Sequence, residues 1–162
     1  MKHSPYLLSA LAAFTLIPAH AQGPLTPPAG PVVPSMKTLD QIEPRTPISA
    51  THTPGDAQSS FIISVPGSYY LTGKITGEVG KNGILIAASG VSIDLGGFSL
   101  EGVPGSLVGI LAGSSVNVLT GLAISNGRIA SWGAQGINGF YHDRAQYERL
   151  RLEKNGDRKS VV

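Results

Sequence analysis

A recurring run of glycine followed by apolar residues constrains the fold of this chain more than any other feature. The run occurs at residues 83–86, 109–112 and 136–138, and its starts are 26 and 27 residues apart. A repeat of this length is typical of solenoids, in which each turn of the chain stacks on the one before. We therefore expect Ile84, Ile110 and Ile137 to lie in one column.

Each repeat also contains a second apolar stretch, at residues 91–95, 122–127 and 150–156. In the first of these, apolar and small polar residues alternate, which indicates a strand with one buried face. A sandwich or barrel would alternate too, but its strands need not return at a fixed interval. The sequence therefore predicts an all-β, right-handed parallel β-helix of about three coils over residues 61–156. A sandwich or barrel is the alternative.

The residues before the repeat differ in composition. Residues 1–21 have the pattern of a secretory signal peptide, with cleavage expected between Ala21 and Gln22. Its apolar run is too short for a membrane anchor, so we expect a secreted or cell-envelope protein without membrane contact after cleavage. Residues 22–60 are expected to be a proline-rich extended spacer and a short lead-in, in which residues 44–60 have little to anchor them. Residues 157–162 depart from the repeat.

Charge and residue types exclude several kinds of site. The net charge of +2 and the mixed signs of the charges after Tyr141 argue against nucleic-acid binding. The chain has no cysteine, and its four histidines lack metal-binding spacing. In the repeat before Tyr141 the only acids are Glu78, Asp94 and Glu101, and Ser125 is the counterpart of Asp94 in the next coil. We therefore predict no catalytic, cofactor-binding or metal-binding residue, and expect Asp94 to be solvated or to cap a corner.

Residues 64–73, 91–100 and 124–133 resemble a bacterial family of exported right-handed parallel β-helix proteins that are related in fold to pectate lyases. The resemblance covers about residues 36–156 and implies that fold. Two features depart from the family. Gly96 stands at a turn where such proteins usually have Asn, and the repeat does not continue after residue 156. The second departure suggests a truncated gene product; the alternative is a short helix that caps the stack.

Aromatic side chains provide the candidate ligand contacts. Trp132 and Tyr141 lie near expected turns, where exposed rings stack on sugars. The alternative for Trp132 is packing over a corner of the stack. We expect a non-catalytic protein with a structural, adhesive or glycan-binding role, whose partner is a polysaccharide or cell-envelope glycan. The alternative is the N-terminal fragment of a polysaccharide lyase or glycoside hydrolase that lacks its catalytic coils. The exposed last coil also predicts self-association, although its charges oppose edge pairing.

Overall fold

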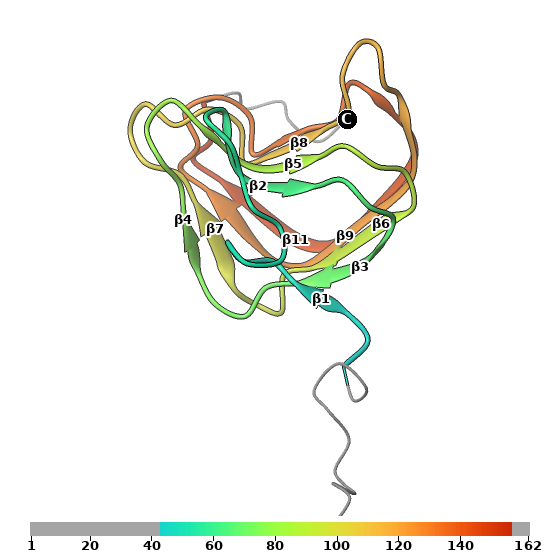
Figure 1. Cartoon of the computed structure of the whole chain (residues 1–162). Coiled ribbons are helices and arrows are strands. Elements are labelled where there is room, and N and C mark those ends of the chain that lie inside the picture. Colours follow the sequence, from blue (N-terminus) through green and yellow to red (C-terminus); the bar gives the residue numbers. More distant parts are fainter. Residues whose placement is uncertain (1–42, 157–162) are drawn as a thin grey trace, which may run out of the picture. The chain divides into compact units, whose positions relative to one another are not determined.

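The chain divides into the units Met1–Ser35 and Met36–Val162, and the computed structural model describes residues 43–156 of the second. These residues form a parallel β-solenoid of about four turns (Figure 1). The predicted all-β solenoid is confirmed, with about four turns in place of three. No helix that could cross a membrane occurs among the described residues. The cleavage site at Ala21 and Gln22 and the tail at 157–162 lie outside them.

One wall of the solenoid is a four-stranded parallel sheet in the order β10-β8-β5-β2. Its strands, in chain order, are β2 (Ser59–Ile63), β5 (Asn82–Ile86), β8 (Ile110–Ala112) and β10 (Ile137–Asn138). Ile84 pairs with Ile110, and Ile110 pairs with Ile137. The isoleucine column predicted from the repeat is therefore confirmed.

The other walls belong to a seven-stranded parallel sheet. Its strands, in chain order, are β1 (Thr46–Pro47), β3 (Gly67–Tyr70), β4 (Ile75–Thr76), β6 (Val91–Asp94), β7 (Ser99–Glu101), β9 (Leu119–Ala130) and β11 (His142–Glu153). The 12-residue strand β9 pairs with β6 near its middle and with β7 at its end. β11 follows β9 along nearly its whole length. Both long strands therefore turn a corner of the solenoid (Figure 1).

The corners are made by residues with left-handed backbone angles, spaced five residues apart along each long strand. In β9 and just after it these are Gly121, Asn126 and Ser131, and in β11 and just after it they are Arg144, Arg149 and Lys154. The pairing of β11 with β9 places each corner of one strand beside a corner of the other. Gly96 and Gly97 make the preceding corner, also with positive φ. Gly and Asn adopt this conformation at low cost, so Gly96 replaces the expected Asn without strain.

The solenoid begins earlier than residue 61. β1 pairs with β3, the Ile48 amide donates to the Tyr70 carbonyl at 2.9 Å, and the Ile48 side chain is buried. The expectation that residues 44–60 have little to anchor them is therefore wrong. Proline is tolerated in an edge strand because a free edge does not need its missing N–H, so Pro47 does not prevent β1 from forming.

The register of the last turn also differs from the expected one. The stretch 150–156 was matched to 122–127, but Leu150 pairs with Gly127 and Ala145 pairs with Leu122. Both stretches end in Asn-Gly, and this shared pair suggests the wrong match. The Gly156 amide donates to the Trp132 carbonyl, so the second Asn-Gly lies one corner later in its turn than the first.

Candidate functional site

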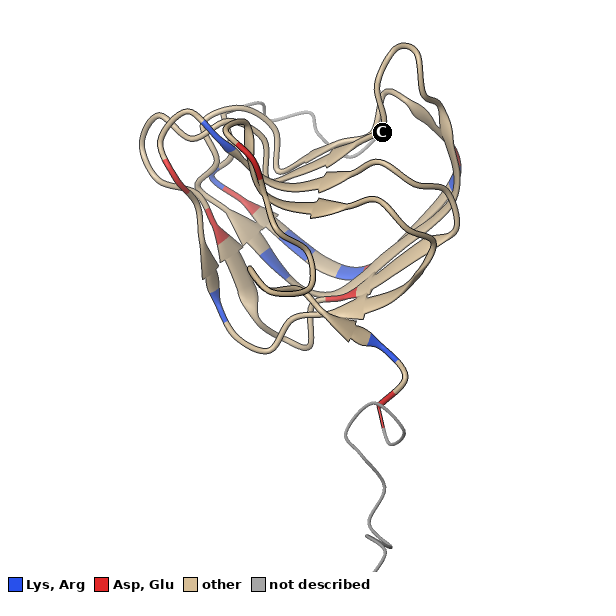
Figure 2. Cartoon of the chain, viewed as in Figure 1, with Lys and Arg blue, Asp and Glu red and all other residues tan. Residues whose placement is uncertain are grey.

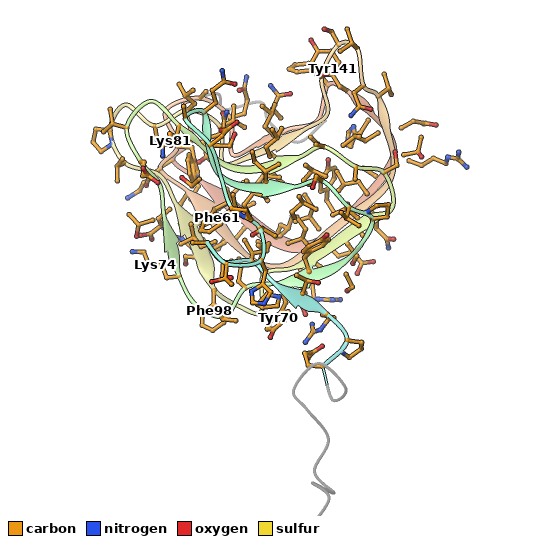
Figure 3. The ribbon with its side chains drawn as sticks, in the orientation of Figure 1. Phe61, Tyr70, Lys74, Lys81, Phe98 and Tyr141 are labelled. Atoms are coloured by element: carbon orange, nitrogen blue, oxygen red, sulfur yellow. The ribbon has the colours of Figure 1, made fainter. Side chains whose placement is uncertain are left out.

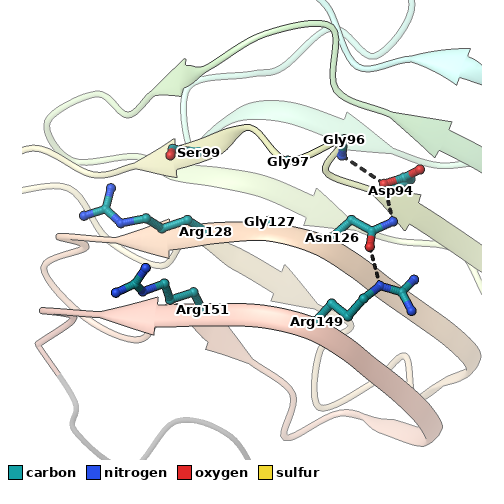
Figure 4. Close-up of a pocket in the computed structure, with 9 residues that line it drawn as sticks. All are labelled: Asp94, Gly96, Gly97, Ser99, Asn126, Gly127, Arg128, Arg149 and Arg151. Atoms are coloured by element: carbon teal, nitrogen blue, oxygen red, sulfur yellow. Dashed lines mark hydrogen bonds between the residues drawn. The ribbon is translucent and has the colours of Figure 1, made fainter.

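A groove opens on the outer surface where β6, β9 and β11 reach their shared corner. It has a volume of about 600 Å³, and we call it the outer-face groove. Besides glycines, its lining comprises Asp94, Ser99, Asn126, Arg128, Arg149 and Arg151 (Figure 4). Three successive turns contribute to it, so the groove exists only when the turns are stacked.

A chain of hydrogen bonds runs across the stacked corners inside the groove (Figure 4). Asp94 Oδ1 accepts from the Gly96 amide at 2.9 Å and from Asn126 Nδ2 at 3.0 Å. Asn126 Oδ1 in turn accepts from Arg149 Nε at 2.5 Å, and Arg45 donates to Asp94 Oδ2 at 3.0 Å. The Gly96 amide and the Asn126 side chain hold the pKa of Asp94 below its ordinary value. The prediction that Asp94 caps a corner is confirmed.

A second set of side chains forms an ion-pair series beside the groove, which we call the ionic ladder: Lys74, Glu101, Arg128, Glu153 and Arg151. Arg128 lies at its centre, with nitrogens 2.5 Å from Glu101 Oε1 and 2.9 Å from Glu153 Oε2. All members of the ladder except Lys74 lie on strands of the seven-stranded sheet, along which Figure 2 shows charged residues, while the strands of the four-stranded sheet carry none. The ladder links residues of four consecutive turns.

Protonation states in and beside the groove favour binding over acid–base catalysis. Lys74 and Arg128 lower the pKa of Glu101, and Arg128 lowers that of Glu153. A glycosidase acid requires the opposite shift, because it must hold a proton near neutral pH. Glu153 and Glu101 raise the pKa of Arg128, so its guanidinium stays protonated. Arg149 and Arg151 extend from the groove with side chains 67% and 76% exposed and can donate to a ligand.

The two aromatic residues predicted to contact a glycan are not in this groove. Trp132 is 1% exposed, and its indole N–H donates to the Leu100 carbonyl at 3.2 Å inside the solenoid. Stacking of Trp132 on a sugar is therefore wrong, since no ligand reaches the ring. Tyr141 is half-buried beside the start of β11, well away from Phe98 (Figure 3). The structure does not bring Trp132 and Tyr141 together on one surface.

Phe98 is the aromatic residue that sequence reasoning missed. Phe98 and Leu100 alternate with Ser99 and Glu101, a pattern that predicts Phe98 on the same buried face as Leu100, but the Phe98 side chain is 39% exposed. The left-handed Gly96-Gly97 corner directly before it breaks the alternation. The Phe98 ring lies close to Gly96, which lines the groove, so the ring borders the groove. The glycine pair was the only signal in the sequence that could have indicated this.

His142 contacts Tyr147, not its neighbour Asp143. His142 Nε2 lies 2.5 Å from the Tyr147 hydroxyl, and burial raises the pKa of Tyr147 to about 12. Asp143 lies on the surface beside Arg144. Successive residues of a strand point to opposite faces, so the Asp143 side chain points away from that of His142. Tyr147 packs against the core, and His142 lies beside it.

Within residues 43–156, no group of three or more His, Asp or Glu side chains is arranged to hold a metal ion. The chain matches no protein-family model, and comparisons with curated proteins and solved structures give no match either.

Proposed function

We propose that this chain is an exported, non-catalytic β-solenoid protein of the pectate-lyase type that binds an acidic polysaccharide of the cell envelope. The outer-face groove is the binding site. Its lining holds three arginines, on two adjacent turns, and one carboxylate, and this composition carries the proposal; Arg128 and Arg151 also contact Glu153 beside the groove. The lining carboxylate, Asp94, already accepts hydrogen bonds from Gly96, Asn126 and Arg45, so it repels an anionic ligand less than a free acid would.

Guanidinium groups suit the carboxylates of uronic acids because their N–H groups form a planar fork that matches two carboxylate oxygens. Arg149 and Arg151 lie two residues apart on β11, and Arg128 is beside Arg151 on the neighbouring turn. Stacked turns repeat at about 4.8 Å, which places charged donors at short intervals across the groove. Phe98 adds an exposed apolar ring at the border, where the C–H face of a sugar can pack.

Titration calorimetry with polygalacturonate, and with dextran as a neutral polymer, tests this function. We expect polygalacturonate to bind with an affinity that falls as salt is added, because charge attraction is screened. We expect dextran to bind at least tenfold more weakly, which corresponds to about 1.4 kcal/mol. No new reducing ends should appear during incubation.

The variant Arg149→Gln/Arg151→Gln should lose at least tenfold in affinity for polygalacturonate, about 1.4 kcal/mol. Arg144→Gln is the matched control, because Arg144 is an exposed arginine of the same strand that does not line the groove. Equal affinity of the double variant and the control would contradict binding in the outer-face groove.

A further inference from the structure

The last turn presents a long strand edge. Among the described residues, β11 pairs with β9 and with no other strand. The backbone N–H and C=O groups along its second edge therefore have no strand partner within residues 43–156. Ala145, Tyr147, Leu150 and Leu152 pack against the core from one side only and are partly exposed. Such an edge is a template for another strand.

The opposite end of the solenoid cannot supply that strand. There the outermost strands are β1 and β4, with two residues each, and β2, whose outer edge already bonds to Thr53 and Asp56. One residue of β1 is Pro47, and Pro44 lies just before this strand, so two backbone donors are missing. Head-to-tail stacking of copies would need β1 to pair with the 12-residue β11. The only long free edge in residues 43–156 is β11 itself.

The sequence of β11 is complementary to itself when it is read in the reverse direction. About a centre between Glu148 and Arg149, the opposed residues are Asp143 with Lys154, Arg144 with Glu153, Ala145 with Leu152, Gln146 with Arg151, Tyr147 with Leu150, and Glu148 with Arg149. Every acid meets a base, and every apolar residue meets another apolar residue. We infer that β11 pairs antiparallel with β11 of a second copy of this chain in a two-fold symmetric dimer.

The corner in β11 fits this symmetry. The strand bends at Arg149, which has φ +50° and lies beside the centre of the pairing. A two-fold axis that bisects the bend exchanges the segment before the corner with the segment after it. Directly opposed residues then keep the same face, because Ala145, Tyr147, Leu150 and Leu152 all pack toward the interior. The same pairing brings the apolar side chains of the last turn of one copy against those of the other copy.

Charged side chains at the ends of the pairing have few contacts within the chain, whereas Glu153 and Arg149 already bond to Arg128 and Asn126. Arg144 and Asp143 are 81% and 67% exposed, and they contact only each other, at 3.5 Å. Lys154 is exposed as well. An isologous contact of this kind closes after two copies, so it yields a dimer and no filament. It requires no ligand in the outer-face groove, although Arg149 and Arg151 belong both to the groove and to the pairing.

Sedimentation equilibrium of the purified chain over a range of concentrations tests the dimer. Asp143→Lys and Lys154→Asp should each place like charges opposite one another at two symmetric positions and weaken dimerisation about tenfold or more. The double variant Asp143→Lys/Lys154→Asp restores both pairs and should regain the dimer. Glu78→Lys is the matched control, since Glu78 is an exposed acid that contacts a lysine near it in sequence, Lys81.

Disulfide cross-linking tests the register, and the chain has no cysteine of its own to interfere. A mixture of Gln146→Cys and Arg151→Cys chains should form cross-linked dimers, because these positions are directly opposed. Either variant alone should not, since its two cysteines would be up to about 17 Å apart along the strands. A monomer at all concentrations, a filament, or cross-linking of single variants as efficient as that of the mixture would overturn the inference.

Discussion

Trp132 fits inside the solenoid because glycines on neighbouring turns leave room for its indole. A Cβ atom at Gly83 would lie 2.7 Å from Trp132 Cη2 and 2.5 Å from the Gly109 carbonyl oxygen. A Cβ atom at Gly77 would also lie 2.7 Å from Trp132 Cη2. The glycine that opens a repeat therefore has a packing role here, in addition to any role in turns. It makes the space that the largest side chain of the core occupies.

Replacement of Gly83 by Ala should destabilise the fold. The added methyl group meets backbone as well as the indole, so we expect a loss of about 1–3 kcal/mol in the free energy of unfolding. Gly73→Ala is the matched control, because a Cβ there has no atom within 4 Å. Urea unfolding followed by tryptophan fluorescence measures both variants. Equal midpoints for the two would show that the core can move to accept the methyl group.

Burial of single residues was only partly predictable from the sequence. Ile84, Ile110 and Ile137 were assigned correctly because the repeat interval alone fixes which residues stack. Burial of Trp132 was one of two alternatives and is confirmed, whereas exposure of Phe98 was missed; both positions depend on corners. Trp132 follows Ser131, and Phe98 follows Gly97, both with left-handed backbone angles that reset the alternation of faces. A period of two holds only within a straight strand.

At the scale of the strand, corners are stabilised by side chains that bridge one turn to the next. Asn126 is the best example in the described part of the chain. Its backbone is left-handed, with φ +60°, and its side chain connects Asp94 on the turn before to Arg149 on the turn after. Asn suits both tasks, because it tolerates this conformation and carries a donor and an acceptor.

Two substitutions separate these tasks of Asn126. Asn126→Gly loses the two hydrogen bonds but keeps a relaxed corner, whereas Asn126→Ala loses the bonds and adds backbone strain. We expect losses in the free energy of unfolding of about 1 kcal/mol for Gly and about 2 kcal/mol for Ala. Thermal and urea unfolding of both variants measure the difference. An Ala variant as stable as the Gly variant would mean that backbone strain at this corner is negligible.

The succession of strands was predictable where glycine repeats mark it and not elsewhere. Both sheets and their parallel pairing follow from the repeat at residues 83–138. β1 was missed because a two-residue strand beside prolines has no pattern of its own; only pairing with β3 and burial of Ile48 define it. The groove was missed for a related reason. Two of its three arginines, Arg149 and Arg151, lie on β11, and the sequence predicted a register for this strand that is shifted by one corner.

For the whole molecule, the ionic ladder connects the ends of the stack. Each turn of a solenoid contacts only its neighbours, so its stability is a sum of interfaces between turns. Arg128 on β9 contributes to two of these interfaces, through Glu101 on β7 and Glu153 on β11. Loss of its charge should therefore weaken both junctions at once, whereas loss of a terminal member such as Lys74 affects one.

The stability of the whole solenoid should consequently fall in acid. The pKa values of Glu101 and Glu153 are lowered on folding from an ordinary value of 4.5, so the folded state binds fewer protons than the unfolded state in mild acid. Their contribution is complete above about pH 4.5 and is lost as the pH falls through the lowered pKa values.

Arg128→Gln removes a shared partner of both acids. We expect this variant to be less stable than the parent at neutral pH and to lose less stability between pH 5 and about pH 3. Urea midpoints measured across this range, with Arg144→Gln as control, test the prediction. Parallel curves for Arg128→Gln and the parent chain would show that the ladder does not contribute to stability in solution.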